Sequence, residues 1–520
     1  MSEKHAVSGV ELAIFSGKLN AICEEMGFVL QRCAFSPNIK DRLDFSCAVF
    51  DRYGKILAQA AHIPVHLGSM AFAMSSLVSR FEWFDGDVVV VNDPFQGGTH
   101  LPDVTLISPV FIDDTLVGYV VNRAHHANIG SRSPGSMPLS SKIEEEGILI
   151  APQKLFAKGI LNQALASQLR AIVPNCASDL PEDFAAQVSA NQVGRCRLAS
   201  WLAAQEKPLQ WFQGLSDALN EYGAELMCRF IETLPDNSFS EFTDYLENDG
   251  FGSGVIELKL RLGREGSFIH FDFSGTSQQV AGNLNCPESV SVASVYYVIA
   301  CMLPEYTPKC DGVFRYINVE APKGSILNAN PGAAVAAGNV ETSMRVVDLV
   351  QGAMIGLGID MPAASQGSMN NIAMGSAGDE GSGRWDYYET IAGGMGAHSG
   401  SRGLSGVQCH MTNTLNTPIE SLELHYPLRI ERYGLRQNSG GLGENLGGNG
   451  LVRKYVFLSN ANVTLLTERR EFRPWGIRAS GGQCGENWHN GSLILGKCAL
   501  EVAAGDTITI ETPGGGGWSS

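Results

Sequence analysis

Five side chains that can bind a metal ion or move a proton are concentrated in the first quarter of the sequence: Asp44, His100, Asp103, His125 and His126. His100 and Asp103 are three residues apart with Pro102 between them. A proline disfavours helical geometry in the residue before it, so the pair is predicted to share a rigid turn. His125 and His126 are adjacent, and neighbouring residues of an extended chain face opposite sides. Only one of them is therefore expected to join the other residues.

This set of residues suits a metal ion. Two imidazoles with carboxylates form a mixed nitrogen and oxygen donor set that fits Zn, Mn or Fe. Such a set can leave one coordination position open for water or substrate. The alternative is structural, because Asp and His are also common in turns. Residue spacing alone leaves both interpretations open.

Two further residues are candidates for acid–base chemistry. His66 follows His62 at a spacing of four, but Pro64 between them argues against a shared helix face. His66 is therefore either a structural histidine near a turn or an acid–base group. Glu389 precedes Gly393 and Gly394, and it either lines a pocket or ends a strand.

The elements that must position these residues are mostly strands in the first part of the chain. Residues 88–91 are four valines in a row, a pattern typical of a strand covered on both faces. They lead into a loop at 92–103. Alternating residues predict hairpins at 45–59 and 104–121, and the second hairpin ends near His125 and His126. If these strands are neighbours, the candidate ligands converge at one sheet edge.

The rest of the chain combines helices and strands. An apolar stripe predicts a helix over residues 12–29, another helix is expected at 69–81, and 161–234 reads as helical. Further strands are predicted at 255–262 and 267–273, and further helices at 288–302 and 342–357. Residues 367–406 hold 11 glycines in 40 positions and are predicted to form a long functional loop. The last hundred residues read as short strands between glycine turns.

Together these patterns predict a multidomain α+β (mixed α/β) fold with a β-rich C-terminal part. At roughly 100–200 residues per domain, 520 residues suggest about two to four domains. We expect a metal-site α/β region with a helical segment at 1–235, a mixed region with glycine-rich loops at 236–410, and a β-rich region at 411–520.

Composition excludes several classes of protein. The formal net charge of −17 argues against nonspecific nucleic-acid binding. No run of 18 apolar residues predicts a membrane span, and the first residues lack the apolar core of a signal peptide. The 12 cysteines are scattered without a Cys-x-x-Cys pair, which favours reduced thiols and a cytoplasmic protein. The sequence contains neither a phosphate-binding loop nor a Gly-x-Ser-x-Gly elbow, so no ATP site is expected in this chain.

Several motifs, in order along nearly the whole chain, resemble the hydantoinase B/oxoprolinase family. The segment Asn92-Asp93-Pro94-Phe95 with Gly97-Gly98-Thr99-His100-Leu101-Pro102-Asp103 carries the strongest similarity. It is joined by Asp44-Phe45-Ser46-Cys47, Gly338-Asn339-Val340-Glu341-Thr342, Tyr388-Glu389-Thr390 and the closing Pro513-Gly514-Gly515-Gly516-Gly517.

The resemblance implies a function beyond what spacing shows. Family members include N-methylhydantoinase, 5-oxoprolinase and caprolactamase subunits, and also subunits of acetone and acetophenone carboxylases. They work with a hydantoinase A-type subunit that binds ATP and phosphorylates the carbonyl oxygen of the substrate. By motif, the family's metal site corresponds to Asp44, His100, Asp103 and His125.

We therefore expect a B-type subunit of an ATP-dependent cyclic-amide hydrolase, in a hetero-oligomer with an A-type partner. It would use a divalent transition metal (Zn, Mn or Fe), with His66 and Glu389 as candidate catalytic residues. The chain is shorter than the acetone carboxylase subunit, which favours hydrolysis. The rival functions are a carboxylase subunit that uses the same site, and a scaffold subunit that only holds a catalytic partner.

Overall fold

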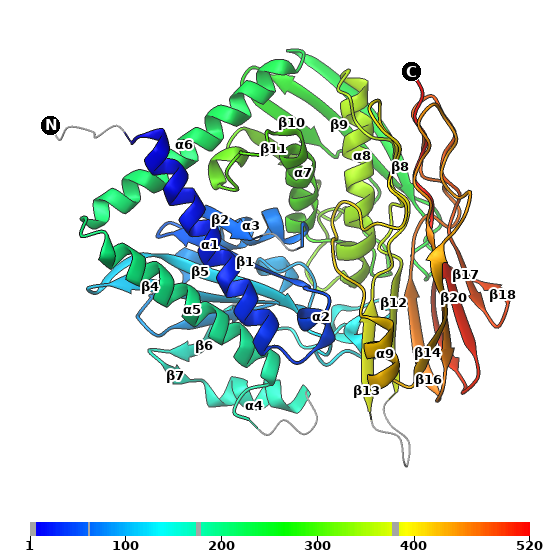
Figure 1. Ribbon diagram of the computed structural model, residues 1–520, viewed down its shortest axis with the longest axis horizontal. Helices are drawn as coiled ribbons and strands as arrows, with labels where there is room; N and C mark the ends of the chain where they lie inside the picture. The colour runs from blue at the N-terminus through cyan, green and yellow to red at the C-terminus, as the bar shows by residue number, and fades with distance from the viewer. Residues whose placement is uncertain (1–6, 61–62, 173–177, 377–383) are drawn as a thin grey trace.

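The first sheet positions most of the candidate site residues. The computed structural model describes residues 7–60, 63–172, 178–376 and 384–520, and Figure 1 shows its arrangement. His62 lies outside the described residues. Seven antiparallel strands are ordered β2-β1-β5-β4-β3-β6-β7. Their bounds are β1 (Phe45–Asp51), β2 (Ile56–Ala60), β3 (Val88–Val91), β4 (Asp103–Ile112), β5 (Thr115–His125), β6 (Gln153–Ala157) and β7 (Ile160–Leu161).

Helices cover both faces of this sheet, as the unbroken run of valines in β3 predicts. On one face lie α1 (Gly9–Cys33) and α5 (Glu182–Ala204), which also pack against each other. On the other face, α3 (His66–Leu77) buries Met70 and Met74 in a cluster with strand residues that include Val89. The helical region predicted at 161–234 is α4 (Gln163–Ile172), α5 and α6 (Leu209–Thr233). A short helix, α2 (Pro37–Lys40), leads into β1.

The β4–β5 hairpin sets the register at the site. Asp113 and Asp114 form its turn with φ of 44° and 60°, a left-handed conformation that Asp tolerates better than most residues. In the resulting ladder the Cα partner of Asp103 is His125. The predicted convergence of the two segments is therefore confirmed.

A second sheet and two buried helices form the middle of the chain. The sheet is ordered β11-β10-β9-β8, with bounds β8 (Ser238–Leu246), β9 (Ile256–Glu265), β10 (Phe268–Asp272) and β11 (Ile317–Glu320). Helix α8 (Ser343–Gly356) packs against β8, β9 and α7 (Glu288–Met302), and α7 packs against α3. The two helices therefore join the second sheet to the first one.

A wide helical turn precedes α8. Residues Gly338–Thr342 form a π-helix, a rare geometry that often lies at functional sites. A Cβ on Gly338 would lie 1.9 Å from the carbonyl oxygen of Asn285. Only glycine permits this close backbone approach, which fixes the turn against its neighbour.

Two further sheets pack face to face at the C-terminal side, at the right of Figure 1. One is ordered β13-β12-β16-β19 and the other β14-β15-β20-β17-β18. Their bounds are β12 (Asn371–Ser376), β13 (Trp385–Glu389), β14 (Leu428–Leu435), β15 (Leu451–Phe457), β16 (Ala461–Leu466), β17 (Glu486–His489), β18 (Ser492–Ile494), β19 (Lys497–Val502) and β20 (Thr507–Glu511); the short α9 (Ile419–His425) precedes β14. The expected α+β class with a β-rich C-terminal part is confirmed.

The glycine-dense segment 367–406 was expected to be a loop, and this is wrong for two stretches of it. Strands β12 and β13 lie within it, with 377–383 between them outside the described residues. The glycines on either side hid the short apolar run Ile372-Ala373-Met374, which pairs with β16. One sheet therefore spans the predicted boundary at residue 410, and the domain division remains a prediction.

The closing glycines pack inside the molecule. Residues 514–517 are buried, and a Cβ on Gly515 would lie 2.0 Å from the carbonyl oxygen of Met395. Strands and backbone segments approach so closely here that a side chain would not fit.

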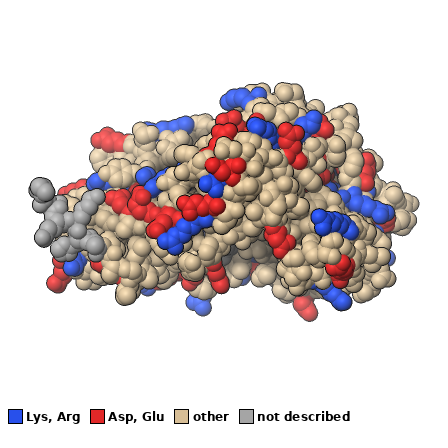
Figure 2. All heavy atoms as spheres, turned by 90° about the horizontal axis from the view of Figure 1, so that it is seen from above, with Lys and Arg blue, Asp and Glu red and all other residues tan. Residues whose placement is uncertain are grey.

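Three features of the described chain bear on its environment. None of its helices has the length and apolar character needed to cross a lipid bilayer. The cysteines described are all free. Figure 2 shows acidic and basic side chains interspersed over the face in view. That face carries no extended basic patch of the kind that nucleic-acid binding through charge requires.

Candidate metal centre

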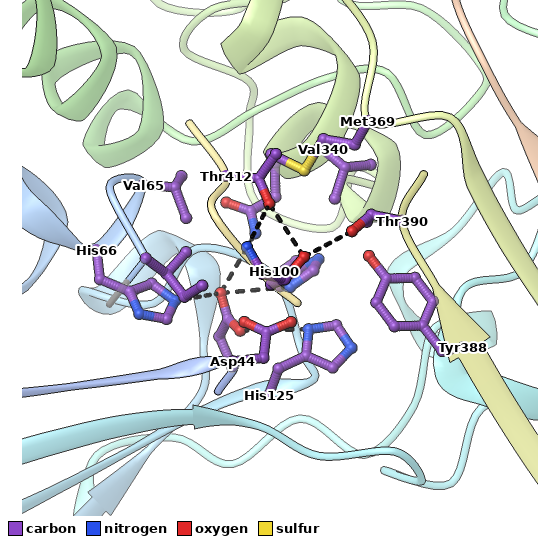
Figure 3. A pocket seen from close by; sticks show the side chains of 14 residues that line it. Asp44, Val65, His66, His100, His125, Val340, Met369, Tyr388, Thr390 and Thr412 are labelled. Atoms are coloured by element: carbon purple, nitrogen blue, oxygen red, sulfur yellow. Dashed lines mark hydrogen bonds and ion pairs between the residues drawn. The ribbon is translucent and has the colours of Figure 1, made fainter. Parts of the chain in front are cut away.

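Asp103 is the centre of a buried cluster of ligand-type side chains. Its Oδ2 lies 3.3 Å from Nε2 of His100, and its Oδ1 lies 3.5 Å from Nδ1 of His125. These three residues together offer ligand atoms that all lie within 4.8 Å of one another. Asp103 is 1% exposed, and Figure 3 shows that His66, His100 and His125 lie close together in the same cavity. Residues that are spread over the sequence thus form one compact donor set.

The loop that carries His100 and Asp103 is held by its own polar residues. The Asn92 amide donates to the carbonyls of Leu101 and Ile148, and its oxygen accepts from the backbone N–H of Ile150. The buried Arg123 donates to the carbonyl of Gly97. The loop is therefore rigid before any ligand binds.

Hydrogen bonds also orient His100 and Asp103. Nδ1 of His100 lies 3.2 Å from the carbonyl oxygen of Ala336, so Nδ1 carries the proton in the neutral imidazole. The lone pair of Nε2 then faces the cluster and can bind a metal ion. Oδ2 of Asp103 accepts from Thr99 Oγ1 at 2.5 Å and from Asn339 Nδ2 at 3.3 Å. Asn339 belongs to the π-turn, so the tight packing of that turn also fixes a partner of Asp103.

The structure separates the two adjacent histidines. His125 lines the cavity and stacks on the ring of Tyr388, with ring centroids 4.8 Å apart and planes 9° apart. His126 points to the other face, where its Nε2 lies 2.9 Å from Oε1 of Gln187 and its ring contacts Phe184. The structure thus places His125, and not His126, with His100 and Asp103.

Asp44 and His66 line the same cavity without joining the tight cluster. Asp44 directly precedes β1, and its carbonyl accepts from the backbone N–H of His125. His66 is the first residue of α3, which begins three residues before the predicted helix start, because Pro64 precedes the helix and does not interrupt it. Its Nε2 lies 3.4 Å from Asp103 Oδ2, and its Nδ1 lies 3.1 Å from Ser46 Oγ.

The cavity has a volume of about 20 Å³, which is room for about one water molecule or one ion. Apolar side chains form part of its wall: Ile63, Val65, Val340 and Met369. Hydroxyls from Thr390, Thr412 and Thr414, together with Tyr388, line another part. Charges in such a low-dielectric enclosure interact more strongly than they do in water.

The residues present fit a metal ion. Nε2 atoms of His66, His100 and His125 are buried and make no hydrogen bond of acceptable geometry, although two of them lie within 3.4 Å of Asp103. Leaving a buried imidazole nitrogen unpaired is costly, and a cation held among His100, Asp103 and His125 would satisfy Nε2 of His100. The donor set of imidazoles with carboxylates fits Zn, Mn or Fe.

Electrostatics favour an ionised Asp103. Burial by itself raises its pKa, but the neighbouring imidazoles of His100 and His66 outweigh burial and hold the pKa well below its usual value. For His100, burial lowers the pKa, yet the Asp103 carboxylate outweighs it and raises the pKa. A carboxylate that stays charged in the interior is the form a cation needs.

The structure does not bring Glu389 into this cavity. Its carboxylate is fully buried between the C-terminal sheets, where Oε1 lies 3.1 Å from a guanidinium nitrogen of Arg453 and accepts from Asn416 at 2.8 Å. The hydroxyl of Tyr455 donates to its other oxygen. Glu389 ends β13, as one of its two predicted interpretations states.

Sequence reasoning missed the cavity residues on either side of Glu389. Tyr388 and Thr390 line the cavity, whereas Tyr387 belongs to the apolar cluster between the C-terminal sheets. The signal was available in the two-residue period of a strand, which places Tyr388 on the face opposite to Glu389. Arg42, Thr412 and Thr414 gave no comparable signal, because loop threonines and a single arginine are common everywhere.

Fold and site together define a multi-sheet α+β protein with a buried histidine and aspartate cluster. The hydantoinase B/oxoprolinase family matches this chain over residues 8–520. The chain belongs to this family.

Several relatives are similar in sequence to nearly the whole of this chain. An uncharacterized protein of Methanocaldococcus jannaschii is 39% identical over 98% of this chain and 90% of its own length. The 5-oxoprolinase 1 of Arabidopsis thaliana is 38% identical over 98% of this chain, which spans only 42% of that relative. A putative D-/L-hydantoinase B-type subunit of a Pseudomonas species is 28% identical over 99% of this chain and 90% of its own length.

Two solved structures share the fold. The ATP-dependent caprolactamase from Pseudomonas jessenii matches with a TM-score of 0.89 at 25% identity, over 99% of this chain and 92% of that one. The nucleotide-free structure of an acetone carboxylase matches with a TM-score of 0.83 at 15% identity, over 97% of this chain and 75% of that one. At this low sequence identity, the match to the acetone carboxylase shows only that the two proteins share a fold.

Proposed function

We propose that this chain is the B-type subunit of an ATP-dependent cyclic-amide hydrolase that opens a hydantoin, 5-oxoproline or lactam ring. The observation that carries the proposal is the buried cluster of His100, Asp103 and His125, with its unpaired imidazole nitrogens, at the wall of a cavity. Relatives named as 5-oxoprolinases and as a hydantoinase subunit, and a similar caprolactamase structure, support the substrate class.

Each residue has a role in this proposal. His100, Asp103 and His125 hold a divalent transition metal ion (Zn, Mn or Fe), with Asp44 as a further oxygen donor beside them. When bound, such an ion supplies Lewis-acid character and lowers the pKa of a coordinated water. The apolar wall excludes bulk water from the reacting atoms.

His66 is the proposed acid–base group. Its Nε2 faces Asp103 Oδ2 at 3.4 Å, and its Nδ1 is fixed by Ser46 Oγ. An imidazole held in this way can take a proton from a water that attacks the phosphate-bearing carbon and return it to the ring nitrogen as the C–N bond breaks. The acyl phosphate left by this step would be hydrolysed by a second water to carboxylate and phosphate. Glu389, by contrast, is enclosed between the C-terminal sheets and contributes through the strand that carries Tyr388.

ATP chemistry is assigned to a partner. The sequence lacks a phosphate-binding loop, and the Pseudomonas relative is named as one subunit of a hydantoinase. The chain spans about two fifths of the Arabidopsis 5-oxoprolinase, so the rest of that longer relative can supply what a separate hydantoinase A-type subunit supplies here. The proposed complex is a hetero-oligomer, and free cysteines agree with a cytoplasmic location.

The decisive experiment uses this chain purified with a hydantoinase A-type subunit. ATP-dependent ring opening is measured on hydantoins, 5-oxoproline and lactams. The proposal is supported if at least one of these substrate classes is opened and the opening requires ATP, both subunits and metal. Bicarbonate-dependent consumption of a ketone identifies a carboxylase. If the complex with a metal-free His100→Ala chain keeps its full ring-opening activity, this chain is a scaffold.

A further inference from the structure

Three linked threonine hydroxyls lie in the wall of the same cavity. Thr390, Thr412 and Thr414 are all buried, and each of them lines the cavity. Oγ1 of Thr390 lies 2.8 Å from Oγ1 of Thr414, which lies 3.3 Å from Oγ1 of Thr412. Figure 3 shows Thr390 and Thr412 on the side of the cavity away from His66 and Asp44. The chain of hydroxyls therefore lies on the opposite side of the cavity from His66 and Asp44.

A buried guanidinium backs this chain of hydroxyls. Arg42 is 0% exposed and donates to Thr390 Oγ1 at 3.0 Å, to Thr414 Oγ1 at 3.4 Å and to the carbonyl of Tyr388 at 2.9 Å. Its plane also lies over the Tyr388 ring, 4.7 Å from the centroid. All these partners are neutral, and Arg42 makes no ion pair with a carboxylate of the described residues. A buried cation without a counter-ion is costly unless a ligand supplies the negative charge.

The hydrogen bonds of the threonine chain leave one hydroxyl proton free. Three hydroxyls carry three protons, and the two contacts between them use two. Arg42 already donates to Thr390 and Thr414, and the backbone N–H of Thr414 approaches Thr412 Oγ1 at 3.5 Å. A consistent direction runs from Thr390 through Thr414 to Thr412. The remaining proton, on Thr412, is then available to a ligand in the cavity.

We propose that this threonine chain, backed by Arg42, binds a negatively charged oxygen of the ligand, of the phosphate or carboxylate type. The site supplies a hydroxyl donor from Thr412 and, behind the hydroxyls, a buried guanidinium without a carboxylate in ion-pair contact among the described residues, which are the two features that favour an anionic oxygen. Within the proposed function, this oxygen belongs to the activated substrate while its reacting carbon faces the metal ligands. That last assignment rests on the proposed function, but the anion site does not.

The test measures anion binding without any reaction. Isothermal titration calorimetry on the metal-loaded chain uses inorganic phosphate and, separately, acetate as probes. Thr412→Val, which keeps the shape and removes the hydroxyl, should weaken binding of the preferred anion about tenfold or more. Thr412→Ser, which keeps the hydroxyl, should bind within about threefold of the unchanged chain. A preference for phosphate identifies a phosphoryl oxygen, and a preference for acetate identifies a carboxylate oxygen.

A buried threonine outside the cavity provides the matched control. Thr464→Val removes the hydroxyl of a buried threonine in β16 that does not line the cavity, and should leave anion affinity unchanged. Equal metal content in all variants separates the hydroxyl effect from damage to the cluster. Equal anion affinity in Thr412→Val and the unchanged chain, a Ser variant as weak as the Val variant, or no anion binding at all would overturn the site. Because neither ATP, partner nor ring is present, failure of ring opening leaves this result untouched.

Discussion

Asp103 and His125 are direct cross-strand partners in the β4–β5 ladder, and their side chains meet with 3.5 Å between Oδ1 and Nδ1. Two residues that are distant in sequence thus form one pair at the end of a hairpin. The register comes from the Asp113-Asp114 turn together with the β-bulge between Val110 and Phe111, and a one-residue slip would point His125 to the opposite face. The metal centre therefore depends on a turn at the far end of the same hairpin.

The first prediction concerns the hairpin itself. Deleting Asp114 should shift the register and abolish metal retention, while replacing Asp113-Asp114 with Asn-Gly should preserve both, because Asn-Gly favours the same left-handed turn. Elemental analysis after dialysis measures the metal. Full metal content in the deletion variant would refute the dependence on register.

The second prediction concerns His100. The unchanged chain should retain about one transition-metal ion through dialysis without chelator, and His100→Ala should lose most of it, because one ligand of a small set has been removed. Circular dichroism should show an intact fold, since the apolar core is large. Elemental analysis that finds full occupancy in this variant contradicts the assignment.

The third prediction separates the adjacent histidines. His125→Ala should lose the metal, whereas His126→Ala should keep it and lose about 1–3 kcal/mol of unfolding free energy, because Gln187 loses a buried hydrogen-bond partner. Metal content and urea unfolding of both variants measure this. The reverse pattern would exchange the two roles.

The fourth prediction assigns Glu389 a structural effect. Glu389→Gln should lower the free energy of unfolding by about 3–5 kcal/mol, because Arg453 is left buried without its counter-ion. The metal content should not change, since the carboxylate lies outside the cavity. The double variant Glu389→Gln/Arg453→Met should recover part of the loss. A folded Glu389→Gln chain of unchanged stability without metal would place this carboxylate in the centre instead.

The fifth prediction is a pH dependence carried by Glu146. Its Oε1 accepts from the backbone N–H groups of Val335 and Ala336, while its Oε2 is buried without a partner. Burial raises its pKa from 4.5 to about 7. The folded protein therefore holds this proton more tightly than the unfolded chain, so its contribution to stability is present below pH 4.5 and is lost as pH rises to about 7.

The neutral variant Glu146→Gln tests this directly. It should be more stable than the unchanged chain at pH 8, by at most about 3 kcal/mol, and should show no such gain at pH 4. Urea unfolding at both pH values measures the difference. An equal effect at both pH values would show that the change acts through packing and not through titration.

The sequence alone determined much of the site's chemistry. Pro102 between His100 and Asp103 excluded a helix and predicted a rigid turn, which the loop anchored by Asn92 confirms. Alternation in the hairpin predicted that His125 or His126 would face the same way as Asp103, because strand geometry has a fixed period of two. The four valines of β3 predicted a strand covered on both faces, and helices do cover both sides.

Tertiary structure decided what local patterns cannot carry. Which of His125 and His126 faces the cluster depends on the register of a ladder and on Gln187 of a distant helix. Arg42, Thr390 and Thr414 come together only because a loop after β13 and a turn before β1 meet behind one wall of the cavity, and nothing local links them. Glu389 was singled out as a charged residue beside glycines, yet its partner Arg453 lies on another strand. Period, turn chemistry and composition are local properties, whereas burial and pairing of a charge depend on segments that only folding brings together.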